Sequence, residues 1–243
     1  MLTVTILQFT TLAMKGGAYV YYFENYVSKN SLSDFISPII DFFSSIGINF
    51  FGSDPVSAGF GLFNAGGIIF MIIGIGLSKM LADKYGKRNV FGVFLFISTL
   101  FILVFYVLSP DSINLIFGAQ IFHGFFYGIT IPLLWAMIAD VADYSEWKNN
   151  RRATAIIFSA MMVGLKLGLS IGGALVASIL GSYGYVPNSV GEQTESAILG
   201  TKMLVSIFPS IPFLVAAALL FFYIIDKKME EKIEQDLLKK RKS

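Results

Sequence analysis

Three ionisable side chains, Lys15, His123 and Lys166, lie inside long apolar stretches of this sequence. An ionisable group within a membrane span costs a few kcal/mol or more, so it marks a functional site by default. The chain has no cysteine and a single histidine, which excludes disulfides and metal sites built from His or Cys clusters. Asp140 and Asp143 are one helical turn apart but near the end of their span, so no deep carboxylate pair is predicted. No metal site is expected.

Lys166 lies near the middle of a predicted span, two residues from a ridge of small residues suited to close helix packing: Gly164, Gly168 and Gly172. A two-residue step turns about 200° around a helix, so Lys166 points away from that ridge. With Ser159 and Ser170 it forms a second, polar face, which we expect to line a water-filled cavity. There Lys166 would hydrogen-bond a substrate or neutralise carboxylates that bind a coupling cation. The alternative is a structural salt bridge.

A second polar face lies on the first predicted span. Its members recur every three or four residues: Thr11, Lys15, Tyr19, Tyr22 and Tyr26. Tyrosine rings pack on the apolar face of a sugar, and their hydroxyls exchange hydrogen bonds with it. Lys15, Tyr19 and Tyr22 are therefore candidate sugar-binding residues. The alternative is a tyrosine belt at the membrane interface, with Lys15 buried against a carboxylate.

His123 belongs to a polar stripe with Gln120, Tyr127 and Thr130 on the fourth predicted span. A proton relay is conceivable at such a stripe. We favour a hydrogen-bonded, neutral histidine near the outer end of the span.

These residues sit in a chain that is 55% hydrophobic and 14% charged, against about 25% charged residues in soluble domains. A spanning helix needs about 20 mostly apolar residues. Six such spans are predicted, over 2–27, 57–80, 89–108, 112–141, 153–181 and 201–225. Pro132 should kink the fourth span, and Pro209 and Pro212 the sixth. The prediction is an all-α membrane protein with a six-helix bundle over 1–225 and a charged tail over 226–243.

Basic residues are distributed unevenly between the two sides of this bundle. They gather in 79–88, 144–152 and 226–243, whereas the opposite loops hold only Lys29 and Lys202. Loops rich in Lys and Arg stay on the cytoplasmic side. We therefore expect both termini to be cytoplasmic, in the plasma membrane of the cell.

Two segments outside the spans have structure of their own. The charged tail is expected to form a short exposed helix along the inner membrane surface. The outer loop over 28–56 is semi-apolar, and we expect it to lie against the membrane or to cap part of an outer cavity. Its apolar residues include Phe35, Ile39, Phe42, Phe43, Phe50 and Phe51.

The loop after the second span combines an acid, a glycine and basic residues in the sequence LSKMLADKYGKR over 77–88. It resembles the loop signature of the major facilitator superfamily. Asp83 can cap a helix or pair with a basic residue and so latch an inner gate, and Gly86 permits a tight turn. The other residues of this signature are Lys84, Lys87 and Arg88.

The segment WAMIADVADYSEWKNNRRAT, which begins at Trp135, is more specific. It resembles the signature of the glycoside–pentoside–hexuronide (GPH):cation symporters, a melibiose-permease-like family of the same superfamily. The stretches KLGLSIGGA from Lys166 and GYVPN from Gly184 resemble that family too. The likeness implies secondary active sugar transport by alternating access, driven by Na⁺, H⁺ or Li⁺. Family members have twelve helices in two bundles, and this chain aligns with helices seven to twelve.

The resemblance assigns roles to individual residues. It implies that Lys166 faces the sugar and cation sites and that Trp135 lies near the sugar. Asp140, Asp143 and Arg152 match an inner-gate network, to which Asp83 and Arg88 are added. The aspartates that bind the coupling cation lie on the family's amino-terminal helices, so cation ligands are not expected in this chain.

The expected function is thus the carboxy-terminal half of a sugar:cation symporter, incomplete without an amino-terminal half. Its expected partners are a small-molecule sugar, membrane lipid and that half, or a second copy in a homodimer. A non-transporting sensor or a lipid-handling carrier of the same superfamily is the alternative. There is no nucleophile–base pair, metal cluster or nucleotide-binding loop, so neither an enzyme nor a cofactor is expected, and no nucleic-acid partner.

Overall fold

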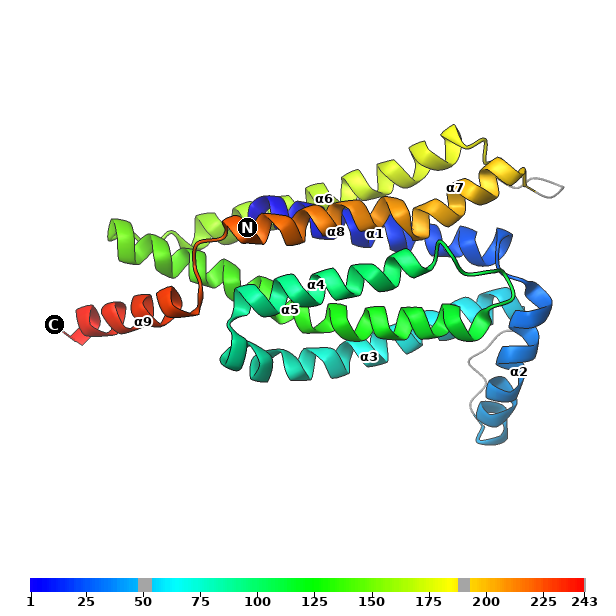
Figure 1. Ribbon diagram of the computed structural model, residues 1–243, viewed down its shortest axis with the longest axis horizontal. Helices are drawn as coiled ribbons and strands as arrows, with labels where there is room; N and C mark the ends of the chain where they lie inside the picture. Colours follow the sequence, from blue (N-terminus) through cyan, green and yellow to red (C-terminus); the bar gives the residue numbers. More distant parts are fainter. Residues whose placement is uncertain (48–53, 188–192, 243) are drawn as a thin grey trace.

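Long apolar stretches interrupted by short polar loops build an all-helical chain. The computed structural model describes residues 1–47, 54–187 and 193–242, and within these ranges it contains helices and no strands. Figure 1 shows most of the helices side by side along one long axis, with α2 turned across this axis at one end and α9 at the other end. Their bounds are α1 Leu2–Asn25, α2 Lys29–Ser45, α3 Pro55–Tyr85, α4 Lys87–Val104, α5 Ile113–Asn149, α6 Thr154–Ser182, α7 Glu195–Val205, α8 Ile207–Leu219, a 3₁₀ turn Leu220–Phe222 and α9 Lys227–Lys242.

Five helical segments of the described chain are long and apolar enough to cross a membrane: Pro55–Tyr85, Lys87–Val104, Ile113–Asn149, Thr154–Ser182 and Glu195–Phe222. The first predicted span, α1, is not among them, because Gln8, Lys15 and several threonines make it less apolar. It nevertheless lies within the bundle, packed along α6 and α8. Most of its polar residues, among them Gln8 and Lys15, are buried, so neighbouring helices provide the cover that its composition requires.

Two helices differ from prediction in their continuity, because mean hydropathy does not show where a helix continues or breaks. The fourth span was predicted to end at 141, but α5 continues through Pro132 and on to Asn149. It stops at Asn150, which adopts a left-handed conformation with φ 53°. The sixth span breaks at Ser206 between α7 and α8. Pro209 explains this break, because it lacks an N–H and its ring clashes with the carbonyl four residues earlier.

The predicted outer loop contains a helix, α2, that the hydropathy pattern did not indicate. Its side chains Leu32 and Ile36 are buried against α3 and α5, while Phe42 is exposed. Phe50 and Phe51 of the predicted loop lie outside the described residues. A serine-rich segment with Pro38 at its centre is a poor helix by propensity, so burial of one apolar side stabilises α2.

Glycines set the closest contacts of the bundle. The predicted ridge on α6 is confirmed: a Cβ on Gly168 would lie 2.5 Å from the Ile6 carbonyl oxygen, and one on Gly172 would lie 2.5 Å from that of Thr10. The α3–α5 seam is built in the same way, with Gly74 against the Phe125 carbonyl. Small residues allow two helix backbones to approach closely, as is common between membrane helices.

Three chain segments meet at one end of the bundle, which we call the basic end: the α3–α4 turn, the α5–α6 connection and α9 (Figure 1). Gly86 forms the turn between α3 and α4 with φ 83°, as its place in the loop signature predicts.

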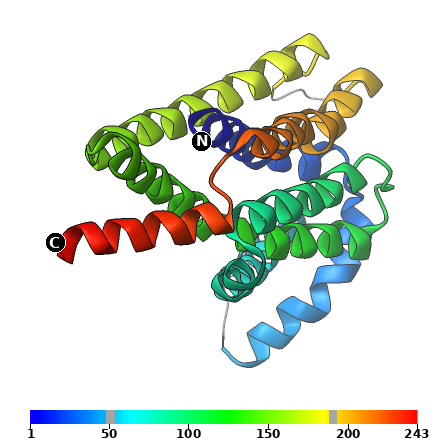
Figure 2. The same cartoon turned by 60° about the vertical axis from the view of Figure 1, so that its left-hand side comes forward.

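The carboxy-terminal helix α9 packs on α5. Ile233 and Leu237 are buried against α5 residues that include Trp147, and the Trp147 indole Nε1 donates to Asp236 Oδ2 at 3.0 Å. Figure 2 shows α9 running past the end of α5. The helix was predicted, but its packing on α5 was not, because Ile233 and Leu237, four residues apart, are the main indication of a buried face.

Candidate functional site

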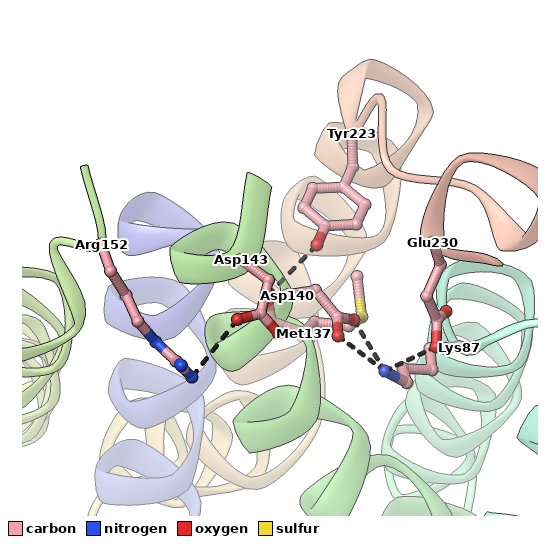
Figure 3. A network of polar contacts seen from close by, with 7 residues as sticks. All are labelled: Lys87, Met137, Asp140, Asp143, Arg152, Tyr223 and Glu230. Carbon is pink, nitrogen blue, oxygen red and sulfur yellow. Dashed lines mark hydrogen bonds and ion pairs between the residues drawn. The ribbon is translucent and has the colours of Figure 1, made fainter. Parts of the chain in front are cut away.

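A network of charged side chains from four segments, joined by Tyr223 from the end of the α8 segment, lies at the basic end (Figure 3). We call it the gate network and define it as Lys87, Asp140, Asp143, Arg152, Tyr223 and Glu230. It connects the first residue of α4, the last turns of α5, the α5–α6 connection and the first turn of α9. The predicted Asp140, Asp143 and Arg152 are therefore brought together.

Lys87 is the centre of this network. Its Nζ lies 2.7 and 2.9 Å from the two carboxylate oxygens of Asp140 and 2.8 Å from Glu230 Oε1. The side chains of Lys87 and Asp140 are only 23% and 14% exposed, so the pair is poorly screened by water. One ammonium thus ties α4 to both α5 and α9, which makes this contact sensitive to any movement between those helices.

Arg152 forms a looser second arm of the network. It lies 3.4 Å from Asp143 and 3.6 Å from Glu146, and its side chain is 53% exposed. Exposed pairs at such distances contribute from nothing to about 1 kcal/mol. Arg152 therefore adds little to stability in this conformation.

The loop between α3 and α4 is joined to the carboxy-terminal segment by hydrogen bonds from basic side chains to backbone carbonyl oxygens. Arg88 Nη1 donates to the Tyr223 carbonyl at 3.0 Å, and Lys227 Nζ donates to the Asp83 carbonyl at 2.7 Å. Among the described residues the Asp83 carboxylate has no hydrogen-bond or ion-pair partner. Asp83 and Arg88 thus lie beside the gate network, but among the described residues neither side chain forms an ion pair with a member of it.

Tyr223 closes the network from the end of the α8 segment. Its hydroxyl donates to the Met137 carbonyl at 3.2 Å (Figure 3). Burial, together with the negative charges of Asp140 and Glu230, raises the pKa of Tyr223. The phenol therefore stays protonated and keeps donating at physiological pH. A cavity of about 390 Å³ adjoins the network, and its lining combines the charged side chains of the network with apolar residues of α9 such as Leu237.

Sequence reasoning missed three members of this site. Lys87 was recognised only as part of a loop signature, and Glu230 and Tyr223 were assigned no role. Glu230 lies shortly after the sixth span, in a helix whose charges alternate in sign. Such a pattern predicts a solvent-exposed helix. Its pairing depends on the docking of α9, which the apolar Ile233 and Leu237 weakly signal.

Replacing Lys87 with methionine is expected to lower the free energy of unfolding by about 1 to 3 kcal/mol, because Asp140 is left partly buried and unpaired. The matched change Arg152→Met should cost less than about 1 kcal/mol, since that pair is exposed. Thermal unfolding in detergent measures both. Equal losses would contradict the central role of Lys87.

The residues predicted to bind sugar separate into two groups. Lys166 is exposed on α6, and Ser159 and Ser170 of the same polar face are exposed with it. Lys166 has no hydrogen-bond or ion-pair partner among the described residues, so the alternative of a salt bridge is not seen in this structure. Trp135 is half-buried on α5, packed against the core.

The polar face of α1 points into its own bundle instead. Lys15 is 4% exposed, and Tyr19 and Tyr22 are buried as well. The Tyr19 hydroxyl donates to Gln120 Oε1 at 2.9 Å, and Lys15 Nζ lies 5.2 Å from the centre of the Tyr19 ring. These three residues do not join Lys166, because α6 presents its glycine ridge, not its polar face, to α1.

His123 is buried on α5. Its Nδ1 lies 3.0 Å from the Ser98 carbonyl oxygen, and its ring stacks on Tyr127 with centres 5.8 Å apart. The favoured interpretation of a hydrogen-bonded histidine fits this environment, in which a neighbouring backbone carbonyl fixes the ring.

Apolar spanning helices closed at one end by a charged network define an α-helical integral membrane protein. Residues 42–227 match the family described as MFS/sugar transport protein. The chain therefore belongs to this family, and the predicted membership of the GPH and major facilitator groups is confirmed. Family membership indicates a transporter rather than an enzyme.

Three relatives illustrate the likeness. An uncharacterized 29.9 kDa protein of Pseudescherichia vulneris is 35% identical over 65% of this chain and 57% of its own length. The uncharacterized symporter YjmB of Bacillus subtilis is 32% identical over 69% of this chain and 36% of its own. The isoprimeverose transporter of Lactiplantibacillus pentosus is 29% identical over 81% and 41%. The chain thus spans less than two thirds of the length of each relative.

Proposed function

We propose that this chain is the carboxy-terminal six-helix bundle of a sugar:cation symporter, which binds its substrate against a second bundle and works by alternating access. The observation that carries the proposal is the exposed Lys166 on α6. A lysine at the centre of a spanning helix costs about 2.5 to 3.5 kcal/mol in hydrocarbon. A facing bundle and a water-filled sugar cavity would remove that cost.

The lengths of the relatives support the same proposal. YjmB and the isoprimeverose transporter are matched over only 36% and 41% of their own length, so each has room for a second bundle. Substrate sites of such transporters lie between two repeats near the middle of the membrane. Lys166 would contribute to one wall of that site, and Trp135 to its floor on α5.

The gate network supplies the moving part of the proposed mechanism. Lys87, Asp140 and Glu230 hold α4, α5 and α9 together through pairs that can separate and re-form. Discrete rearrangement of such contacts is a common basis of two-state switching. We place this network on the cytoplasmic side of the plasma membrane, because Lys and Arg gather there. Na⁺, H⁺ or Li⁺ would drive uptake, with ligands on the second bundle.

Uptake into proteoliposomes tests the proposal. The chain alone is expected not to concentrate sugar under a Na⁺ or H⁺ gradient, because it offers half a cavity. Joined behind the amino-terminal half of the isoprimeverose transporter, it is expected to concentrate isoprimeverose, and that half alone serves as the control. Concentrative uptake by the isolated chain would overturn the proposal, as would uptake of a lysolipid but no sugar by the joined protein.

A further inference from the structure

An apolar groove of about 590 Å³ runs between α4 and α8 at the basic end. Its lining includes Arg88, Gly92, Phe96, Leu214, Ala217 and Phe221. Phe96 and Phe221 are exposed. Both helical segments that form the groove are apolar enough to cross a membrane, so hydrocarbon chains of lipid border it.

The length of the groove is close to the thickness of the hydrocarbon layer of one lipid leaflet. Arg88 and Phe96 are eight residues apart on α4, which is about 12 Å along a helix. The hydrocarbon core is about 30 Å thick, so one leaflet supplies roughly 15 Å. An acyl chain that starts beside Arg88 would therefore run the length of the groove and end near the middle of the membrane.

Arg88 gives the mouth of the groove a positive charge that the protein does not neutralise. Within the described residues its one hydrogen bond joins Nη1 to the uncharged Tyr223 carbonyl, and no carboxylate pairs with it. The neighbouring Lys87 is already held by Asp140 and Glu230. A guanidinium has five N–H donors in a fork that matches phosphate oxygens, so Arg88 retains donors for a phosphate.

We propose that the α4–α8 groove binds one anionic phospholipid, with its phosphate on Arg88 and an acyl chain along Gly92, Phe96 and Ala217. Basic pockets between membrane helices on the cytoplasmic side bind anionic lipid head groups. The apolar walls select a lipid rather than a free phosphate, and the unpaired charge selects an anionic head group rather than a zwitterionic one. This site is separate from the polar face of Lys166 and does not depend on the proposed transport function.

Native mass spectrometry of the delipidated chain, titrated with phosphatidylglycerol or phosphatidylcholine, tests the site. The unmodified chain is expected to bind one phosphatidylglycerol about tenfold more tightly than phosphatidylcholine, the ratio that one charge-assisted contact provides. Arg88→Gln should remove this preference. Lys84→Gln, an exposed cation outside the groove lining, is the matched control and should keep it.

Two further variants keep the test decisive if Arg88→Gln fails to fold. Arg88→Lys retains the charge and should retain most of the preference. Gly92→Leu should fill the groove and weaken both lipids, and its Cβ is tolerated, because it would lie in van der Waals contact with Leu220 Cδ1 at 3.4 Å. Equal affinity of the unmodified chain for the two lipids would overturn the proposal. So would unchanged phosphatidylglycerol binding in Gly92→Leu, or displacement of the lipid by inorganic phosphate.

Discussion

Replacing Lys166 with methionine is expected to lower sugar uptake by the joined two-bundle transporter about ten- to hundredfold. A hydrogen bond from a charged group is worth about 1.5 to 3 kcal/mol, and tenfold corresponds to 1.4 kcal/mol. Initial uptake rates at equal amounts of folded protein measure the effect. Lys202→Met is the matched control, because Lys202 lies over the rings of Tyr26 and Tyr106, away from the Lys166 face.

Thiol labelling separates a ligand-binding role of Lys166 from a structural one. This chain has no native cysteine, so Lys166→Cys adds a single reactive thiol to its half of the joined transporter. The thiolate is the nucleophile, and hydrocarbon suppresses its formation, so position 166 should label at least about tenfold faster than Leu167→Cys. Sugar should slow that labelling. Equal rates at the two positions, or normal uptake by Lys166→Met, would contradict a wet, sugar-facing surface.

The orientation of α6 could be predicted from sequence, because a glycine ridge and a lysine mark opposite sides of this helix. Gly168 and its neighbours at intervals of four require a close backbone contact, and the structure supplies it at the Ile6 carbonyl. Lys166, two residues away, must then point in the opposite direction. Helical geometry alone connects these positions, so the orientation follows without knowledge of any partner helix.

The face of α1 shows where such reasoning stops. Periodicity correctly indicates that Lys15, Tyr19 and Tyr22 share one side of the helix, but it does not say whether that side meets a cavity or the bundle core. Their burial depends on contacts with distant residues, such as the hydrogen bond from Tyr19 to Gln120. Glu230 was missed for the same reason, because its partner Lys87 is far away in the sequence.

Replacing Gly168 with leucine is expected to lower the free energy of unfolding by about 3 kcal/mol or more, the upper end for overpacking. The new Cβ would meet the Ile6 carbonyl at 2.5 Å and the Phe9 Cβ at 2.9 Å, so α6 must move away from α1. Backbone atoms cannot rotate aside as a flexible side chain can. The midpoint of thermal unfolding in detergent should fall by at least about 6 °C for a chain of this size.

Gly173→Leu on the same helix is the matched control, because a Cβ there has no heavy atom within 4 Å. It should change the unfolding midpoint little. The contrast matters for α1, because that helix packs along α6 and α8. If Gly168→Leu separates the two helices, α1 is left without the cover that its polar residues need, and the folded yield should fall with the midpoint. Equal stability of both variants would mean that α1 and α6 do not meet along the glycine ridge.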